Sequence, residues 1–121
     1  MKLEGTYKKI VSRISREQFG TFFSSCKPEE WFSEAEMSSF VYPRCAGSLA
    51  ARYLIKKVIG DFIGDYNKLN EIEILNDDKG RPVIIFGGNI EKIIMSSGIK
   101  RIECSISHSR NYFACMTILC F

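Results

Sequence analysis

The spacing of apolar and polar positions along the chain changes from a helical period in the first half to alternation in the second. The longest helical signal covers residues 46–60, where Ala46, Leu49 and Tyr53 recur at intervals of three and four. Gly60 is a natural end for this helix, because glycine adopts the left-handed conformation of a C-terminal cap at little cost. We therefore expect one long helix near the centre of the chain.

Shorter elements are predicted before this helix. The segment from Leu3 to Tyr7 gives a weak signal for a first strand or turn. Ser15, with Gln18 three residues later, has the pattern of a capping box and predicts the start of a helix. Pro28 is expected to open a second short helix, because the first helical turn leaves its N–H groups unpaired in any case.

Two apolar runs around a polar turn predict a β-hairpin in the second half. Residues 71–75, EIEIL, alternate between acidic and apolar side chains, and residues 82–86, PVIIF, follow the turn NDDKG. Gly80 is expected in a left-handed conformation within the turn. Pro82 cannot donate to a ladder, so it is expected at the start of its strand or on an edge. A short helix is predicted over residues 90–97.

The C-terminal segment predicts a second hairpin, with strands at residues 102–107 and 112–121 and the turn HSRN between them. Both strands are apolar at nearly every position, so we expect both of their faces to be buried. Helices followed by two hairpins around a short helix indicate an α+β fold. The length of 121 residues fits a single domain over residues 1–121.

Composition adds a mild basic charge and free thiols to this picture. The formal net charge is +3, and basic residues gather in the first sixteen positions, where they suit an acidic partner or phosphates, or form a solvated face. The five cysteines include no Cys-x-x-Cys pair, which disfavours disulfides and zinc and favours a reducing cytoplasm. The N-terminus lacks the apolar core of a signal peptide, and no run approaches the ~18 apolar residues of a membrane span, so no membrane is expected as a partner.

Four segments carry a resemblance to a known family. They are AGSLAARYLIKKVIG at residues 46–60, EIEILNDDKGRPVII at 71–85, SGIKRI at 97–102 and CSISHSRNYFACMTIL at 104–119. In order and spacing they resemble the holo-acyl-carrier-protein synthases, the small trimeric type of 4′-phosphopantetheinyl transferase. The resemblance covers residues 44–119, whereas the first 40 residues match poorly.

The resemblance implies transfer of 4′-phosphopantetheine from coenzyme A to a serine of an acyl carrier protein, by a homotrimer with active sites between subunits. Family members hold Mg²⁺ with two carboxylates, and the matching positions here are Tyr7 and Tyr53. A neutral phenol, with a pKa of roughly 10, is a poor ligand for Mg²⁺. No metal ligand is therefore assigned, and Asp61 and Asp65 are the candidates to replace the lost carboxylates.

The other candidate site residues also follow from the resemblance. Lys57 is the candidate catalytic residue, because the matching lysine reaches the phosphates; a solvated lysine near a helix end is its alternative. His108 is expected beside the nucleotide, with hydroxyl groups from Ser107 and Ser109, and an ordinary turn histidine is the alternative. The remaining matches are Arg44, Gly80 and Pro82 for coenzyme A, and Arg13 and Arg16 for the carrier protein. Surface charges and a well-formed turn are the alternatives for these five.

Two hypotheses of function stay open. The first is a working transferase with an altered metal site, and the second is a catalytically impaired homologue that binds coenzyme A or a carrier protein without turnover. The motifs support the family's role, but the loss of one preorganised electrostatic group typically costs about 10²–10³ in rate. A nucleic-acid-binding module is disfavoured, because aromatic residues do not interleave with the basic ones as stacking platforms would.

Overall fold

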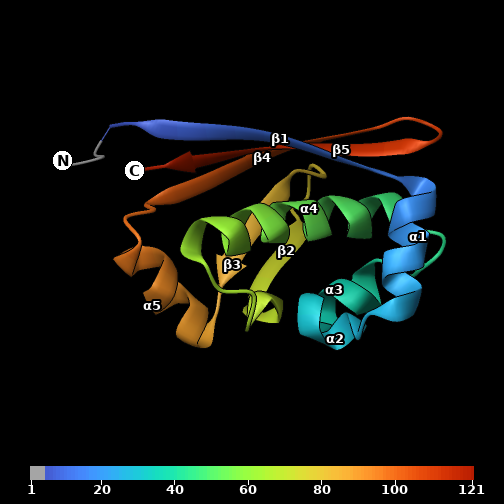
Figure 1. Cartoon of the computed structure of the whole chain (residues 1–121), viewed down its shortest axis with the longest axis horizontal. Coiled ribbons are helices and arrows are strands. Elements are labelled where there is room, and N and C mark those ends of the chain that lie inside the picture. Colours follow the sequence, from blue (N-terminus) through green and yellow to red (C-terminus); the bar gives the residue numbers. More distant parts are fainter. Residues whose placement is uncertain (1–4) are drawn as a thin grey trace.

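A three-stranded antiparallel sheet with one long helix packed beneath it forms the centre of the fold (Figure 1). The computed structural model describes residues 5–121. The sheet consists of β1 (Tyr7–Ser15), β4 (Arg101–His108) and β5 (Tyr112–Cys120), and the helix is α4 (Ala46–Ile63). The other elements are α1 (Arg16–Ser25), α2 (Pro28–Trp31), α3 (Glu34–Ser39), the short 3₁₀ helix η1 (Leu69–Glu71), β2 (Ile72–Asn76), β3 (Pro82–Phe86) and α5 (Gly88–Ser96).

The sheet has the strand order β1-β5-β4, so the C-terminal strand lies at its centre. Phe113, Cys115 and Leu119 of β5 are buried on the side of α4, while the alternate residues Met116 and Ile118 point to the opposite face. Within residues 5–121 no element covers that opposite face (Figure 1). The expectation that both strands of the final hairpin are buried on both faces is therefore wrong, because only one layer packs against the sheet.

The first strand lies later in the chain than predicted. Part of the predicted segment Leu3–Tyr7 falls outside the described residues, and β1 begins only at Tyr7. Its residues Ile10 and Ile14 pack against the apolar core, and the strand pairs with β5 along its whole length. Pairing with an apolar partner strand therefore fixes this element more strongly than its own weak local preference.

The predicted helices are present, but the bounds of α4 and α5 differ from those predicted, and α3 was not predicted. Ser15 caps α1 through the predicted capping box, Pro28 opens α2, and α5 occupies most of the segment predicted at residues 90–97. Gly60 does not end α4: the helix continues to Ile63, and Gly64, with φ of 71°, is the left-handed cap. Neither α4 nor any other helix in the described part of the chain is long and apolar enough to cross a membrane.

The first predicted hairpin is confirmed as the two-stranded sheet of β2 and β3. Gly80 has φ of 79°, as its place in the turn requires, and Pro82 is the first residue of its strand. The side chain of Asp77 completes the turn, because its Oδ1 accepts from the N–H groups of Lys79 and Arg81, both at 2.9 Å.

The outer edge of β2 is held by charged side chains in place of a third strand. The N–H of Ile74 donates to Glu36 Oε2 at 3.0 Å, and its carbonyl accepts from Arg52 Nε at 2.6 Å. Glu36 also pairs with Lys56, whose Nζ donates to the carbonyl of Trp31 at 2.7 Å. These buried bonds tie α2, α3, α4 and β2 together, and they offset the cost of burying charge.

Candidate functional site

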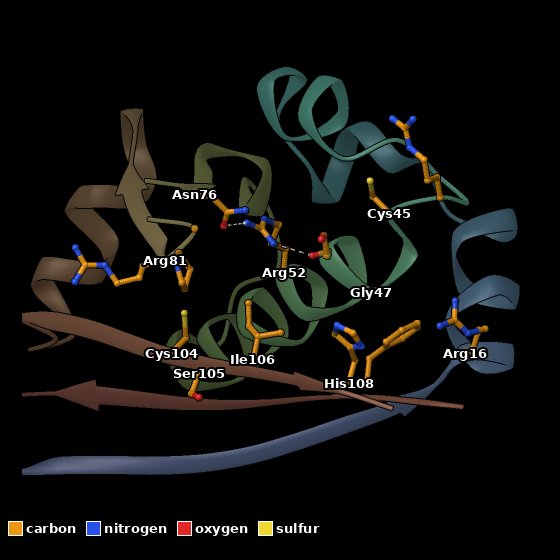
Figure 2. A pocket seen from close by; sticks show the side chains of 15 residues that line it. Arg16, Cys45, Gly47, Arg52, Asn76, Arg81, Cys104, Ser105, Ile106 and His108 are labelled. Carbon is orange, nitrogen blue, oxygen red and sulfur yellow. Dashed lines mark hydrogen bonds between the residues drawn. The ribbon is translucent and has the colours of Figure 1, made fainter. Parts of the chain in front are cut away.

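An open cavity of about 610 Å³ lies between β4, the first half of α4 and the turn of the β2–β3 hairpin (Figure 2). Its lining includes Arg16, Arg44, Arg52, Arg81 and His108, which come from different parts of the chain. No aspartate or glutamate is among the described residues that line it. A cavity with several cations and no carboxylate suits an anion, above all a phosphate, which arginine can bind through two parallel hydrogen bonds.

Arg52 lies in the wall of the cavity and has an exposed fraction of only 1%. Its Nε donates to the Ile74 carbonyl at 2.6 Å. Its Nη1 donates to the Ser48 carbonyl at 3.0 Å and its Nη2 to Asn76 Oδ1 at 3.1 Å (Figure 2). Burial lowers the pKa of Arg52, but a guanidinium group stays protonated in proteins. Because none of these three acceptors carries a charge, Arg52 contributes a net positive charge to the wall.

The N-terminus of α4 also opens on the cavity. Cys45 is its N-cap residue and makes no side-chain capping bond; the N–H of Ala46 donates to the Pro43 carbonyl at 3.1 Å, and no side chain caps the next N–H groups of the helix. Gly47 and Ser48 of this first turn line the cavity. Gly47 permits a close approach to the sheet, because a Cβ atom there would lie 3.1 Å from Cε1 of Phe113. A helix N-terminus favours an anion by its dipole and its free donors, which adds to the charge of the arginines.

The basic side chains are spread along the cavity. Arg16 and Arg81 lie at opposite ends in Figure 2, with Arg52 and His108 between them. Arg16 donates from Nε to the carbonyl of Arg110 at 3.1 Å, and Arg81 Nε lies 3.1 Å from Asp77 Oδ2. This arrangement suits an elongated ligand with more than one phosphate.

The structure brings together four of the six residues predicted to bind the coenzyme. Arg44, Gly80, Pro82 and His108 all line the cavity. Ser107 and Ser109 do not: Ser107 alternates with His108 and faces the other side of the sheet, and Ser109 lies in the turn. The sequence predicted His108 in the turn, whereas it is the last residue of β4, where strand alternation turns Ser107 to the opposite face.

Three arginines of the cavity were not predicted there. Arg52 and Arg81 belong to two of the four segments of the resemblance, but their approach depends on the tertiary fold. Arg16 was predicted beside Arg13 at a carrier-protein surface. Its guanidinium instead lies 4.7 Å from the ring centre of Phe113, whereas that of Arg13 lies 4.9 Å from the ring of Tyr112. Tyr112 and Phe113 are consecutive residues of β5 and point to opposite faces of the sheet. Arg13 and Arg16, which lie over these two rings, therefore lie on opposite sides of the sheet.

Lys57, the predicted catalytic residue, lies away from this cavity. It is five residues beyond Arg52, which places it about 140° around the helix. It shares its face of α4 with Tyr53 and Asp61, which are spaced four residues on either side. Lys57 Nζ is 3.3 Å from Asp61 Oδ2, and both side chains are about half exposed, at 49% and 48%. Within one copy of the chain, the cavity and Lys57 are therefore separate.

The two tyrosines predicted to replace metal-binding carboxylates do not fit a divalent cation. The ring centre of Tyr53 lies 4.1 Å from that of Phe22 and 4.9 Å from that of Trp31. Burial in this cluster raises the pKa of Tyr53, so its hydroxyl stays neutral. Tyr7 is 69% exposed and alternates with the core-facing Ile10, so it points away from α4.

The two aspartates predicted to replace those carboxylates already have partners. Asp61 accepts from Lys57 at one oxygen and from the Tyr66 hydroxyl at the other. Asp65 Oδ1 accepts from the N–H of Asn67 at 2.8 Å. In the part of the chain that the structure describes, no three His, Cys, Asp or Glu side chains are grouped so as to hold a metal ion. The described donor groups therefore do not form the Mg²⁺ site that the resemblance implies.

The chain is similar to proteins of known family over most of its length. It is 33% identical over 113 residues to a holo-acyl-carrier-protein synthase of Fusobacterium nucleatum subsp. nucleatum, and the match covers 93% of this chain and 89% of that protein. It is 36% identical over 112 residues to a protein of the same name from Geobacillus sp., with 93% of this chain and 78% of that protein covered. A solved ACPS–CoA complex from Chronobacterium ammoniagenes has the same fold, with a TM-score of 0.78, 22% identity and coverage of 96% of this chain and 98% of that one. No protein-family model matches the chain.

Proposed function

The chain belongs to the holo-acyl-carrier-protein synthase family, and from this membership we propose that it transfers 4′-phosphopantetheine from coenzyme A to a serine of an acyl carrier protein. The serine hydroxyl attacks the β-phosphate of the pyrophosphate, and 3′,5′-adenosine bisphosphate leaves. This chemistry requires groups that position the phosphates, neutralise their charge and accept the serine proton.

The cavity with several cations and no carboxylate is the observation that best supports this proposal. Coenzyme A carries a 3′-phosphate and a pyrophosphate, and a solved relative of the same fold is a complex with coenzyme A. Arg44, Arg52 and His108, with the N-terminus of α4, would bind these phosphates. Gly80 and Pro82 would border the adenine side.

Lys57 would meet the phosphates from a second copy of the chain. Because it lies on another face of α4 than the cavity, one chain cannot present both groups to one ligand without rearrangement. A homotrimer with sites between subunits resolves this, and the open face of the sheet is our proposed contact. That face carries Tyr7 and Val11, which are 69% and 71% exposed, beside Met116 and Ile118, and apolar side chains in such a patch favour association.

The acyl carrier protein is the proposed macromolecular partner. Arg13 is exposed over the ring of Tyr112, at the end of the open face beyond Val11 and opposite to Tyr7, where it would contact an acidic helix of a carrier bound beside the subunit contact. Arg16 lies in the cavity instead, so we assign it to the phosphates. We place the reaction in the cytoplasm, because all five cysteines are free thiols, as a reducing compartment maintains them.

The second candidate function is binding of coenzyme A or a carrier protein without turnover. The packing of Tyr53 against Phe22 and Trp31 favours it, because this aromatic cluster occupies the position matched to a metal-binding carboxylate. A transferase on this chain would have to stabilise the phosphates through Lys57 and the arginines alone, with no step through a divalent cation.

Mass spectrometry of apo carrier proteins, incubated with the purified chain and coenzyme A, separates the two functions. A gain of one phosphopantetheine per carrier would support the transferase, and the reaction should persist when EDTA is present. No gain, in a run where a synthase such as that of Fusobacterium nucleatum modifies the same carriers, would refute turnover. Calorimetry with coenzyme A would then test the binding function, with His108→Ala as the variant that should weaken it.

A further inference from the structure

The side chains of Lys57, Asp61 and Tyr66 form a continuous hydrogen-bonded series on the face of α4 that carries Lys57. Lys57 Nζ is 3.3 Å from Asp61 Oδ2, and the hydroxyl of Tyr66 donates to Asp61 Oδ1. Tyr66 follows the helix, beyond the left-handed cap at Gly64, so the polypeptide folds back on α4 to bring the Tyr66 hydroxyl to Asp61. Both carboxylate oxygens of Asp61 therefore accept a hydrogen bond.

Gly60 makes room for the Tyr66 ring. A Cβ atom at Gly60 would lie 2.7 Å from Cδ1 and 2.9 Å from Cε1 of that ring, closer than real side chains approach. Glycine is otherwise unfavourable inside a helix, where alanine is preferred. The ring of Tyr66 gives a physical reason for glycine at this buried position.

Lys8 of β1 also lies near this group of side chains. It shares a cleft of about 240 Å³ with Asp61, and its Nζ lies 5.8 Å from the ring centre of Phe62. The hydrogen bond from Tyr66, and to a lesser degree the bond from Lys57, lowers the pKa of Asp61. Asp61 is therefore a carboxylate at neutral pH and attracts the ammonium group of Lys57.

We propose that Asp61 and Tyr66 are positioning residues for Lys57, which hold its amine in place before the phosphates arrive. This inference rests on the proposed function, in which Lys57 meets the phosphates of coenzyme A. A free lysine side chain loses many rotamers when it binds, whereas a lysine that is already held loses fewer and reacts from a productive geometry. The inference also gives Asp61 a role other than that of a replacement metal ligand.

The first test compares the kinetics of transfer to a carrier protein in four variants. Asp61→Asn, Tyr66→Phe and Gly60→Ala should each lower kcat, by about twofold for Asp61→Asn because its pair with Lys57 is half exposed, with little change in KM for coenzyme A. Gly60→Ala is informative because it keeps every polar group and presses chiefly on the Tyr66 ring, with the Asp65 carbonyl oxygen 3.3 Å from the added Cβ. Asp65→Asn is the matched control: it removes a charge from the same loop, keeps the oxygen that accepts from Asn67, and should leave kcat unchanged.

The second test does not need turnover. Brief acetylation of the ligand-free protein with acetic anhydride, read by peptide mass spectrometry, measures how freely the Lys57 amine reacts relative to Lys92 in the same sample. The reactivity of Lys57 should rise in all three variants and not in Asp65→Asn. An unchanged kcat in Asp61→Asn, or an unchanged reactivity of Lys57 in all variants, would overturn the inference. If the unmodified protein transfers nothing, the proposed function fails, and the acetylation result alone decides whether Asp61 and Tyr66 hold Lys57.

Discussion

Lys56 Nζ and Glu36 Oε1 lie 2.5 Å apart inside the protein, and neither side chain has any exposed surface. Glu36 also accepts from the N–H groups of Ser33 and Ile74, at 2.9 and 3.0 Å. Burial lowers the pKa of Lys56 from 10.5 to about 8, although the charge of Glu36 opposes this shift. The pair ties α3 and α4 to β2, the strand whose Asn76 lines the cavity.

Lys56→Met is expected to lower the free energy of unfolding by about 3–5 kcal/mol, because Glu36 keeps its buried charge and loses its partner. Urea denaturation followed by circular dichroism measures the change. Lys57→Met is the matched control, since its half-exposed pair with Asp61 contributes only about 0.3–0.5 kcal/mol. Similar losses in both variants would contradict a special role for the buried pair.

The turn of the β2–β3 hairpin is expected to lose stability in acid. Hydrogen bonds to Asp77, first of all from the N–H of Arg81, lower its pKa below the ordinary value of 3.8. At a pH between the folded pKa of Asp77 and its ordinary value of 3.8, the unfolded chain binds more protons than the folded one. The stabilisation by these bonds is therefore complete above pH 3.8 and disappears as the pH falls through the folded pKa.

Asp77→Asn tests this pH dependence. The variant should be less stable than the unmodified protein near pH 6, and the difference should shrink as the pH falls below 3.8 and Asp77 becomes protonated in the folded state as well. Asp78→Asn is the control, because it removes the neighbouring exposed carboxylate and leaves the hydrogen bonds of Asp77 in place. A constant difference for Asp77→Asn across this range would count against the bonds of the turn as its cause.

Arg44→Ala is expected to weaken the binding of coenzyme A by about tenfold to a hundredfold, because the loss of one hydrogen bond to a charged group reduces affinity by that factor. Isothermal titration calorimetry at fixed salt measures the affinity. Arg101→Ala is the control, because Arg101 lies on β4 outside the cavity and pairs with Glu103 at 3.3 Å. If both variants bind as tightly as the unmodified protein, the cavity is not the coenzyme site.

Val11→Glu is expected to convert the proposed homotrimer to a monomer without unfolding it. Val11 is 71% exposed and lies opposite Met116 on the open face of the sheet, where a charge opposes burial between subunits. Light scattering at micromolar concentration gives the mass, and circular dichroism checks the fold. Val83→Glu, on an exposed residue of the other sheet, should leave the mass unchanged. An unmodified protein that is already monomeric would refute the shared site.

Local signals in the sequence were sufficient where residues close in the chain determine the structure. The capping box of Ser15 and Gln18 and the left-handed turn at Gly80 depend on neighbours within a few positions, and both were predicted correctly. The motifs around Arg44 and His108 likewise identified part of the cavity lining. The overall family could therefore be inferred before any contact was known.

Only the tertiary structure decided the features that depend on distant residues. Arg16 joins the cavity because β1 and α1 bring it over Phe113, and nothing near it in the sequence indicates this contact. Glu36 and Lys56 can be buried because each neutralises the charge of the other, although they are 20 residues apart in the sequence. Hydropathy alone predicts that charged residues lie at the surface. The open face of the final hairpin follows from the number of layers that pack on the sheet, which is a property of the whole fold.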